Sequence, residues 1–182
     1  MNCKKRIKIL FIVLILFVKI LEAQIIDGFS FEKYKVEKLS TYQKAKINYL
    51  SNPTVKYFKT RITNGYKTGK IDFAAYYITI TWGCGTGCID GAMVDVRDGK
   101  VYDLPLGEST YYYGCALSDT ESCVEYKPNS RLFITVYCSE IEIENSKDNE
   151  QEKIFFINVW DEKKKEFVQI DKFTKSKIVG RD

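Results

Sequence analysis

Residues 73–104, FAAYYITITWGCGTGCIDGAMVDVRDGKVYDL, contain the patterns that decide the expected fold. Between positions 76 and 82, tyrosine, isoleucine and tryptophan alternate with tyrosine and threonine, and this period of two predicts a β-strand. Both faces of the strand are fairly apolar, so we expect it inside a sheet rather than at its edge, with other layers covering part of each face. The Arg-Asp-Gly-Lys sequence at 97–100 predicts a hairpin turn before a further strand at 101–104.

A loop rich in glycine and cysteine separates the first strand from the next extended segment at 89–96. Three glycines in five positions allow backbone angles that a side chain would forbid, so the chain must turn tightly there. In an oxidising compartment the default for two nearby cysteines is a structural disulfide, which would hold this loop. The cysteines are Cys84 and Cys88, and the other loop residues are Trp82, Gly83, Gly85, Thr86 and Gly87.

Two other readings of the cysteine pair stay open. One is a redox-active dithiol, although the usual redox spacing has two intervening residues and a helix N-terminus, whereas a strand precedes this pair. The other is a copper site with Met93 or Cys138 as a further ligand, because soft sulfur ligands suit Cu(I). The chain contains no histidine, which removes the commonest general base, the Ser-His and Cys-His pairs and most zinc sites. This argues against an enzyme, and we expect no cofactor, no catalytic residue and no metal.

The same stretch resembles a family of uncharacterised exported bacterial domains. Its members carry a Phe-Ala-Gly-His-Tyr strand, then Trp-Gly-Cys-Gly-Thr-x-Cys, then an Asp-x-x-x-Gly-Lys-Val-Tyr hairpin that ends in Leu-Pro. Ala75 stands where the family usually has glycine and Tyr76 where it usually has histidine, so any role of that histidine is absent here. The resemblance continues more weakly over residues 54–136 and implies no established reaction. The matching residues are Phe73, Ala74 and Tyr77; Trp82, Gly83, Cys84, Gly85, Thr86 and Cys88; and Asp95, Gly99, Lys100, Val101, Tyr102, Leu104 and Pro105.

The first 23 residues have the order of a secretory signal peptide. Four basic residues precede an apolar run of ten at 9–18, and Leu-Glu-Ala at 21–23 is a plausible cleavage site before Gln24. The apolar run is shorter than the roughly 20 residues of a membrane span, so we expect no stable anchor after cleavage. An uncleaved N-terminal anchor is the alternative. Residues 24–182 would then form a single exported domain, periplasmic or secreted, with its core at about 54–170.

Removal of the leader changes the charge balance. The whole chain has 28 basic and 24 acidic residues, but five of the former and one of the latter lie in residues 1–23, which leaves 23 of each. The mature chain is therefore neutral, and its net charge indicates neither a nucleic-acid partner nor an anionic membrane surface.

The remaining elements predict a mainly β fold. Val55, Phe58 and Ile62 mark one apolar face of a helix that begins near Pro53 and that Asn64-Gly65 would end, and residues 42–50 are a candidate second helix. Six to eight strands follow at short intervals, with the acidic run at 139–153 read as a solvated loop and the tail at 171–182 as frayed. We expect an antiparallel meander, as an open twisted sheet or small sandwich with propeller-blade-like hairpins, and one or two N-terminal helices packed against it.

Further cysteines and tyrosines complete the candidate site. Local pairing predicts a second disulfide between Cys115 and Cys123, which leaves Cys138 as a free thiol or as the partner of one of the other four. Three consecutive tyrosines offer rigid area with polar tips for an interface, unless they pack on the sheet as strand residues. They are Tyr111, Tyr112 and Tyr113.

The sequence therefore predicts an exported, disulfide-braced domain that binds a protein or cell-envelope partner or has a structural role there. The alternative function is thiol redox or copper handling by Cys84 and Cys88.

Overall fold

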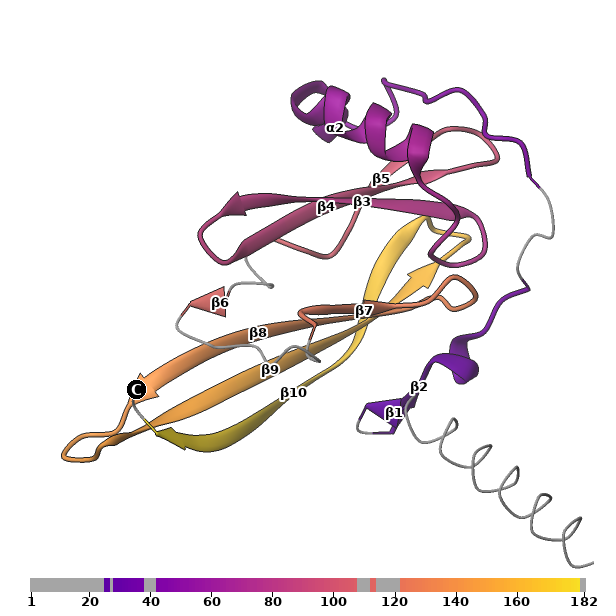
Figure 1. The fold of residues 1–182 in the computed structure, drawn as a ribbon. Coiled ribbons are helices and arrows are strands. Elements are labelled where there is room, and N and C mark those ends of the chain that lie inside the picture. Colours follow the sequence, from indigo (N-terminus) through magenta and orange to yellow (C-terminus); the bar gives the residue numbers. More distant parts are fainter. Residues whose placement is uncertain (1–24, 27, 38–41, 108–111, 114–121, 181–182) are drawn as a thin grey trace, which may run out of the picture.

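The computed structural model describes residues 25–26, 28–37, 42–107, 112–113 and 122–180 and arranges them in layers (Figure 1). Helix α2 (Thr54–Thr68) lies on a three-stranded antiparallel sheet, and a larger sheet packs on the other face of that sheet. A short N-terminal segment covers part of the far side of the larger sheet. The predicted fold class is confirmed, since the chain is mainly β, with two main antiparallel sheets and one α-helix among the described residues.

The smaller sheet contains the stretch on which the prediction rested. It consists of β3 (Tyr77–Gly85), β4 (Cys88–Asp95) and β5 (Val101–Asp103), in that order. The hairpin turn at 97–100 is present, with Gly99 at φ 73°. The expected place of the first strand was wrong, because β3 is an edge strand and β4 is central. Both faces of β3 are apolar because α2 covers one face and the larger sheet covers the other. Apolar faces therefore do not require that a strand be paired along both of its edges.

Helix α2 continues past the point where the sequence predicted its end. Gly65 lies inside the helix, and Gly69 follows its last residue. A Cβ at Gly65 would lie 2.7 Å from Cγ1 of Ile80, and a Cβ at Gly69 would lie 2.6 Å from Cγ2 of Ile78. Both glycines therefore let the helix approach β3 closely. The candidate helix at 42–50 is absent: this segment has no regular structure before a turn, and it bonds to the β4–β5 turn through Ala45 N–H to Val96 O (2.9 Å).

The larger sheet is built on three long antiparallel strands. They are β8 (Leu132–Glu142), β9 (Asp148–Asp161) and β10 (Glu166–Gly180), with the short strands β7 (Val124–Tyr126) and β6 (Tyr112–Tyr113) beside β8. The acidic run is thus mainly strand, since only residues 143–147 form the turn, and the tail pairs with β9 as far as Gly180. Both loop predictions were wrong because cross-strand pairing overrides the polar composition of these segments.

Three apolar clusters hold the layers together. The first joins α2 to the smaller sheet, the second lies between the two sheets, and the third joins the larger sheet to the N-terminal segment. That segment includes β1 (Ile25–Ile26), β2 (Phe29–Ser30) and the 3-10 helix η1 (Phe31–Tyr34). The most buried aromatic residues, Phe73, Tyr77, Phe133 and Trp160, all belong to the second cluster. The junction of the two sheets is therefore the centre of the core.

Within the described ranges, no helix has the length and apolar composition needed to cross a membrane. The predicted signal peptide at 1–23 lies outside the described residues, and the export of residues 24–182 stays a prediction.

Candidate interaction site

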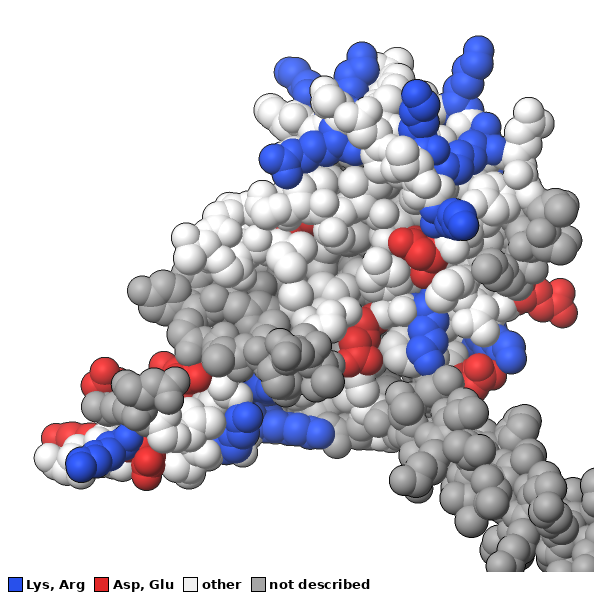
Figure 2. Space-filling model, viewed as in Figure 1, with Lys and Arg blue, Asp and Glu red and all other residues white. Residues whose placement is uncertain are grey.

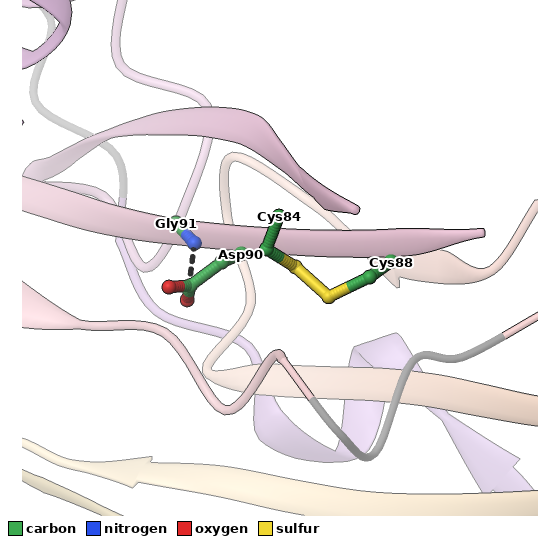
Figure 3. Close-up of a disulfide and its surroundings, with 4 residues drawn as sticks. All are labelled: Cys84, Cys88, Asp90 and Gly91. Carbon is green, nitrogen blue, oxygen red and sulfur yellow. Dashed lines mark hydrogen bonds between the residues drawn. A yellow bond between two sulfur atoms is a disulfide. The ribbon is translucent and has the colours of Figure 1, made fainter. Parts of the chain in front are cut away.

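The predicted disulfide between Cys84 and Cys88 is present at the end of the β3–β4 hairpin (Figure 3). Their Cα atoms are 5.1 Å apart, which is within the ordinary range for a disulfide. Gly85 (φ 147°) and Gly87 (φ 70°) have backbone angles that favour glycine, as the sequence indicated. Residues 83–87 are all exposed, and together with Cys88 we call them the disulfide tip.

The disulfide tip is anchored at its base by Trp82. This side chain is buried and stacks on Phe58 of α2, with 4.4 Å between the ring centroids. The Asp90 carboxylate near the bridge accepts a hydrogen bond from the N–H of Gly91 (2.7 Å), so it is engaged locally (Figure 3). The disulfide tip is thus held in two places. The contact of Trp82 with α2 holds its base on β3, and the bridge holds its turn.

The bridge contributes more to local shape than to global stability. It joins residues only four positions apart, and closing so small a loop is worth about 2 kcal/mol in the chain-entropy model. Neither cysteine belongs to an apolar cluster of the core. The chemistry available at the tip is therefore recognition by exposed backbone groups and the Thr86 hydroxyl, or thiol exchange at an accessible disulfide.

The structure describes only some of the other candidate cysteines and tyrosines. Tyr111 and Cys115 lie outside the described residues, and so does half of the predicted Cys115–Cys123 bridge. Tyr112–Tyr113 form β6, which pairs in parallel with Cys138 and Ser139, so this part of the tyrosine triplet is strand. Of the two alternatives for Cys138, the bonded form is correct: it is a disulfide cysteine, and the expectation of a free thiol was wrong.

A polar cluster between the two sheets was not predicted. We call it the inter-sheet cluster: it consists of Tyr77, Asp95 and Arg97 from the smaller sheet and its turn, and of Trp160, Glu162 and Lys165 from the β9–β10 hairpin. Tyr77 Oη donates to Glu162 Oε2 (2.7 Å), and Trp160 Nε1 donates to the same oxygen (2.8 Å). Arg97 binds Asp95 through Nε (2.8 Å) and Glu162 through Nη2 (2.6 Å).

The charges of the inter-sheet cluster balance. Two carboxylates face one guanidinium and one ammonium, and Lys165 Nζ lies 2.9 Å from Tyr77 Oη. Burial raises the pKa of Glu162, but hydrogen bonds from Lys165, Tyr77, Arg97 and Trp160 outweigh it and bring that pKa to about 2. Burial, together with the hydrogen bond to Glu162, raises the pKa of Tyr77. At neutral pH Glu162 is therefore ionised and Tyr77 is protonated, which suits a structural link better than acid–base catalysis.

One sequence signal pointed weakly to this cluster. Buried Tyr and Trp side chains usually have a hydrogen-bond partner, and both Tyr77 and Trp160 have one. Trp82 carries the same signal, but its Nε1 has no partner among the described residues. The partners of Tyr77 and Trp160 are up to 88 positions away in the chain, so no local pattern identifies them. Beside the cluster lies an open groove of about 340 Å³, lined among others by Asn52, Tyr102 and Phe167.

The described ranges contain no group of three or more cysteine or carboxylate side chains placed to hold a metal ion. No family model matches the chain, and no match was found among the curated proteins or among the solved structures. The resemblance to the exported bacterial domains therefore stays a prediction.

Proposed function

We propose that this chain is an exported, non-enzymatic binding domain that presents the disulfide tip to a protein or cell-envelope partner. The observation that carries the proposal is the position of the bridge. It closes an exposed turn, in which only Cys88 is partly buried, and lies apart from the apolar clusters, so its main effect is to fix the shape of a surface. A surface that is rigid before binding loses less conformational entropy in the complex.

The composition of the disulfide tip agrees with this role. Three glycines expose the backbone of residues 83–87, which gives a partner close access to peptide N–H and C=O groups. The contact between Trp82 and Phe58 fixes the orientation of the disulfide tip relative to α2 and the smaller sheet. The partner that fits is a surface with hydrogen-bonding groups and a shallow concavity, rather than a small molecule.

Thiol redox activity is the second candidate, and the exposure of Cys84 supports it. Structural disulfides of secreted proteins resist reduction, with potentials below about −300 mV, whereas catalytic ones lie at higher potentials. Equilibration of the protein with glutathione buffers, followed by peptide mapping of Cys84 and Cys88, separates the two candidates. A bridge that stays oxidised in a buffer at about −300 mV supports the binding domain, and reduction or ready exchange there supports the redox protein.

The double variant Cys84→Ser/Cys88→Ser tests the binding role. We expect it to keep the far-UV circular dichroism of the native protein and to lose about 2 kcal/mol or less of unfolding free energy, because only a small loop is released. Chemical cross-linking in the compartment where the protein resides should yield a defined complex with the native chain and not with the variant. The matched control is Thr81→Ala, an exposed change on β3 outside the bridge. A complex that forms equally well with the double variant contradicts the proposed function.

A further inference from the structure

The surface around α2 is strongly basic although residues 24–182 contain equal numbers of basic and acidic residues. Residues 42–71 contain seven lysine or arginine residues and no aspartate or glutamate. One of them, Lys44, is directed to backbone carbonyls at the end of α2. The other six are exposed, and none forms an ion pair within the described part of the chain. They are Lys46, Lys56, Lys59, Arg61, Lys67 and Lys70. Figure 2 shows these basic side chains gathered over the helix, and we call this surface the basic cap.

The basic cap also exposes large apolar side chains. Leu50 is 97% exposed and Tyr57, in the first turn of α2, is 76% exposed. The turn that holds Leu50 is well ordered: its N–H donates to Asn48 Oδ1 (3.1 Å), and both the N–H and the hydroxyl of Ser51 donate to the Asn48 carbonyl. A rigid turn thus holds an aliphatic side chain in water beside lysines, where it contributes nothing to the core.

The opposite end of the molecule carries mixed charge. The β8–β9 hairpin projects away from α2 (Figure 1), and Figure 2 shows acidic and basic side chains side by side there. The carboxylates of this hairpin are Glu140, Glu142, Glu144, Asp148, Glu150 and Glu152. This end also contains Lys147 and Lys153, and the paired part of β10 adds Lys172, Lys175 and Lys177, so it is only weakly negative. Net positive charge is therefore concentrated at the basic cap, which is the face that a negative surface attracts.

We propose that the basic cap docks on the surface of an anionic lipid bilayer, with Leu50 and Tyr57 entering the boundary between headgroups and acyl chains. Each basic residue near such a surface strengthens binding roughly fivefold, and a buried aliphatic side chain adds to this. An acidic protein or a nucleic acid would also attract the lysines, but neither requires a fully exposed leucine. This surface is separate from the disulfide tip, so it does not depend on the proposed function.

Vesicle sedimentation tests the docking. The protein, as released by its host, is mixed with two kinds of vesicle at low and high salt. One is pure phosphatidylcholine, and the other contains phosphatidylcholine and phosphatidylglycerol. Binding to pure phosphatidylcholine would reveal a contribution from the apolar run at 9–18. We expect binding only to the anionic vesicles, weakened by salt. The triple variant Lys56→Glu/Lys59→Glu/Arg61→Glu should lose binding at least a hundredfold. The control Lys147→Glu/Lys172→Glu/Lys177→Glu has the same net charge and should keep it.

The leucine distinguishes a bilayer from other anionic partners. Leu50→Ser should weaken vesicle binding several-fold while leaving its salt dependence unchanged, and circular dichroism should show that the fold is intact. Absence of binding to anionic vesicles overturns the proposal, and so does equal loss in both triple variants. Native-like vesicle binding by Leu50→Ser also overturns it, as does tighter binding to poly-glutamate or DNA than to vesicles, because the cap would then be a site for an acidic macromolecule.

Discussion

At the scale of single residues, Gly65 of α2 has the sequence pattern of a helix end, but the structure explains this glycine by packing against a distant strand. Asn64-Gly65 is typical of a helix end, because glycine readily adopts the left-handed conformation that ends many helices. In the structure the helix continues through Gly65, whose missing side chain lets Ile80 of β3 approach. The glycine is thus explained by packing rather than by backbone conformation.

We expect Gly65→Ala to lower the free energy of unfolding by about 1 kcal/mol. Alanine favours the helix by about 1 kcal/mol, but the new Cβ would overlap the branched side chain of Ile80, and overpacking of this kind costs about 1–3 kcal/mol. Urea unfolding measures the net change. Asn64→Ala, an exposed neighbour in the same helix, should instead be neutral or slightly stabilising. A stabilised Gly65→Ala protein would show that α2 does not pack as closely as described.

At the scale of elements, α2 obtains its C-terminal cap from a distant residue. Lys44 Nζ donates to the carbonyls of Tyr66 (2.5 Å), Lys67 (3.1 Å) and Gly69 (2.7 Å). These carbonyls lie at the negative end of the helix dipole and need partners. The segment at 42–48, which forms no helix of its own, therefore stabilises the helix that follows it.

Replacement of Lys44 by alanine should cost about 1–2 kcal/mol of unfolding free energy, because hydrogen bonds from a charged donor are lost at partly buried carbonyls. The matched change Lys46→Ala removes an equal charge from an exposed position two residues away and should stay within about 0.5 kcal/mol of the native protein. Thermal and chemical unfolding of both variants check this. Equal effects would mean that the loss of charge, and not the cap, determines the result.

At the scale of the whole molecule, the inter-sheet cluster joins two sheets that are otherwise held by apolar contacts. Its partners come from the start of β3, the β4–β5 turn and the β9–β10 hairpin. Tyr77 and Trp160 are buried with their polar atoms satisfied. The Arg97–Glu162 pair lies toward the surface, whereas the carboxylate of Asp95 is buried. The cluster therefore specifies how the sheets are aligned, whereas the apolar core supplies most of the attraction between them.

The cluster predicts a loss of stability in acid. The pKa of Glu162 is lowered from 4.5 to about 2, so the folded state favours the charged form. Its contribution is fully present above pH 4.5 and is lost as the pH falls from there through about 2. Glu162→Gln should be less stable by about 1–2 kcal/mol at neutral pH, the lower part of the range for charged hydrogen bonds because the side chain is one-third exposed.

Melting temperatures between pH 7 and pH 2 test this prediction. The native protein should lose more stability below pH 4.5 than Glu162→Gln does, so the two curves should converge in acid. Glu166→Gln in the same hairpin, whose side chain is exposed, is the control and should follow the native curve. Parallel curves for the native protein and Glu162→Gln would contradict the assignment.

The sequence by itself determined the mainly β class, the hairpin at 97–100 and the helix that begins near Pro53, and it favoured the disulfide between Cys84 and Cys88 over a dithiol or a copper site. Each of these depends on residues close together in the chain. Strand alternation, turn-forming glycines and short cysteine spacing act through local backbone preferences, which a sequence displays directly.

Only the tertiary structure decided the edge position of β3, the strand character of the acidic run, the packing role of Gly65 and the bonded state of Cys138. It also brought together the inter-sheet cluster and gathered the basic side chains of residues 42–71 into the basic cap. These features depend on contacts between distant segments. Burial and cross-strand pairing determine which arrangement of these segments has the lowest free energy, and no local pattern in the sequence encodes them.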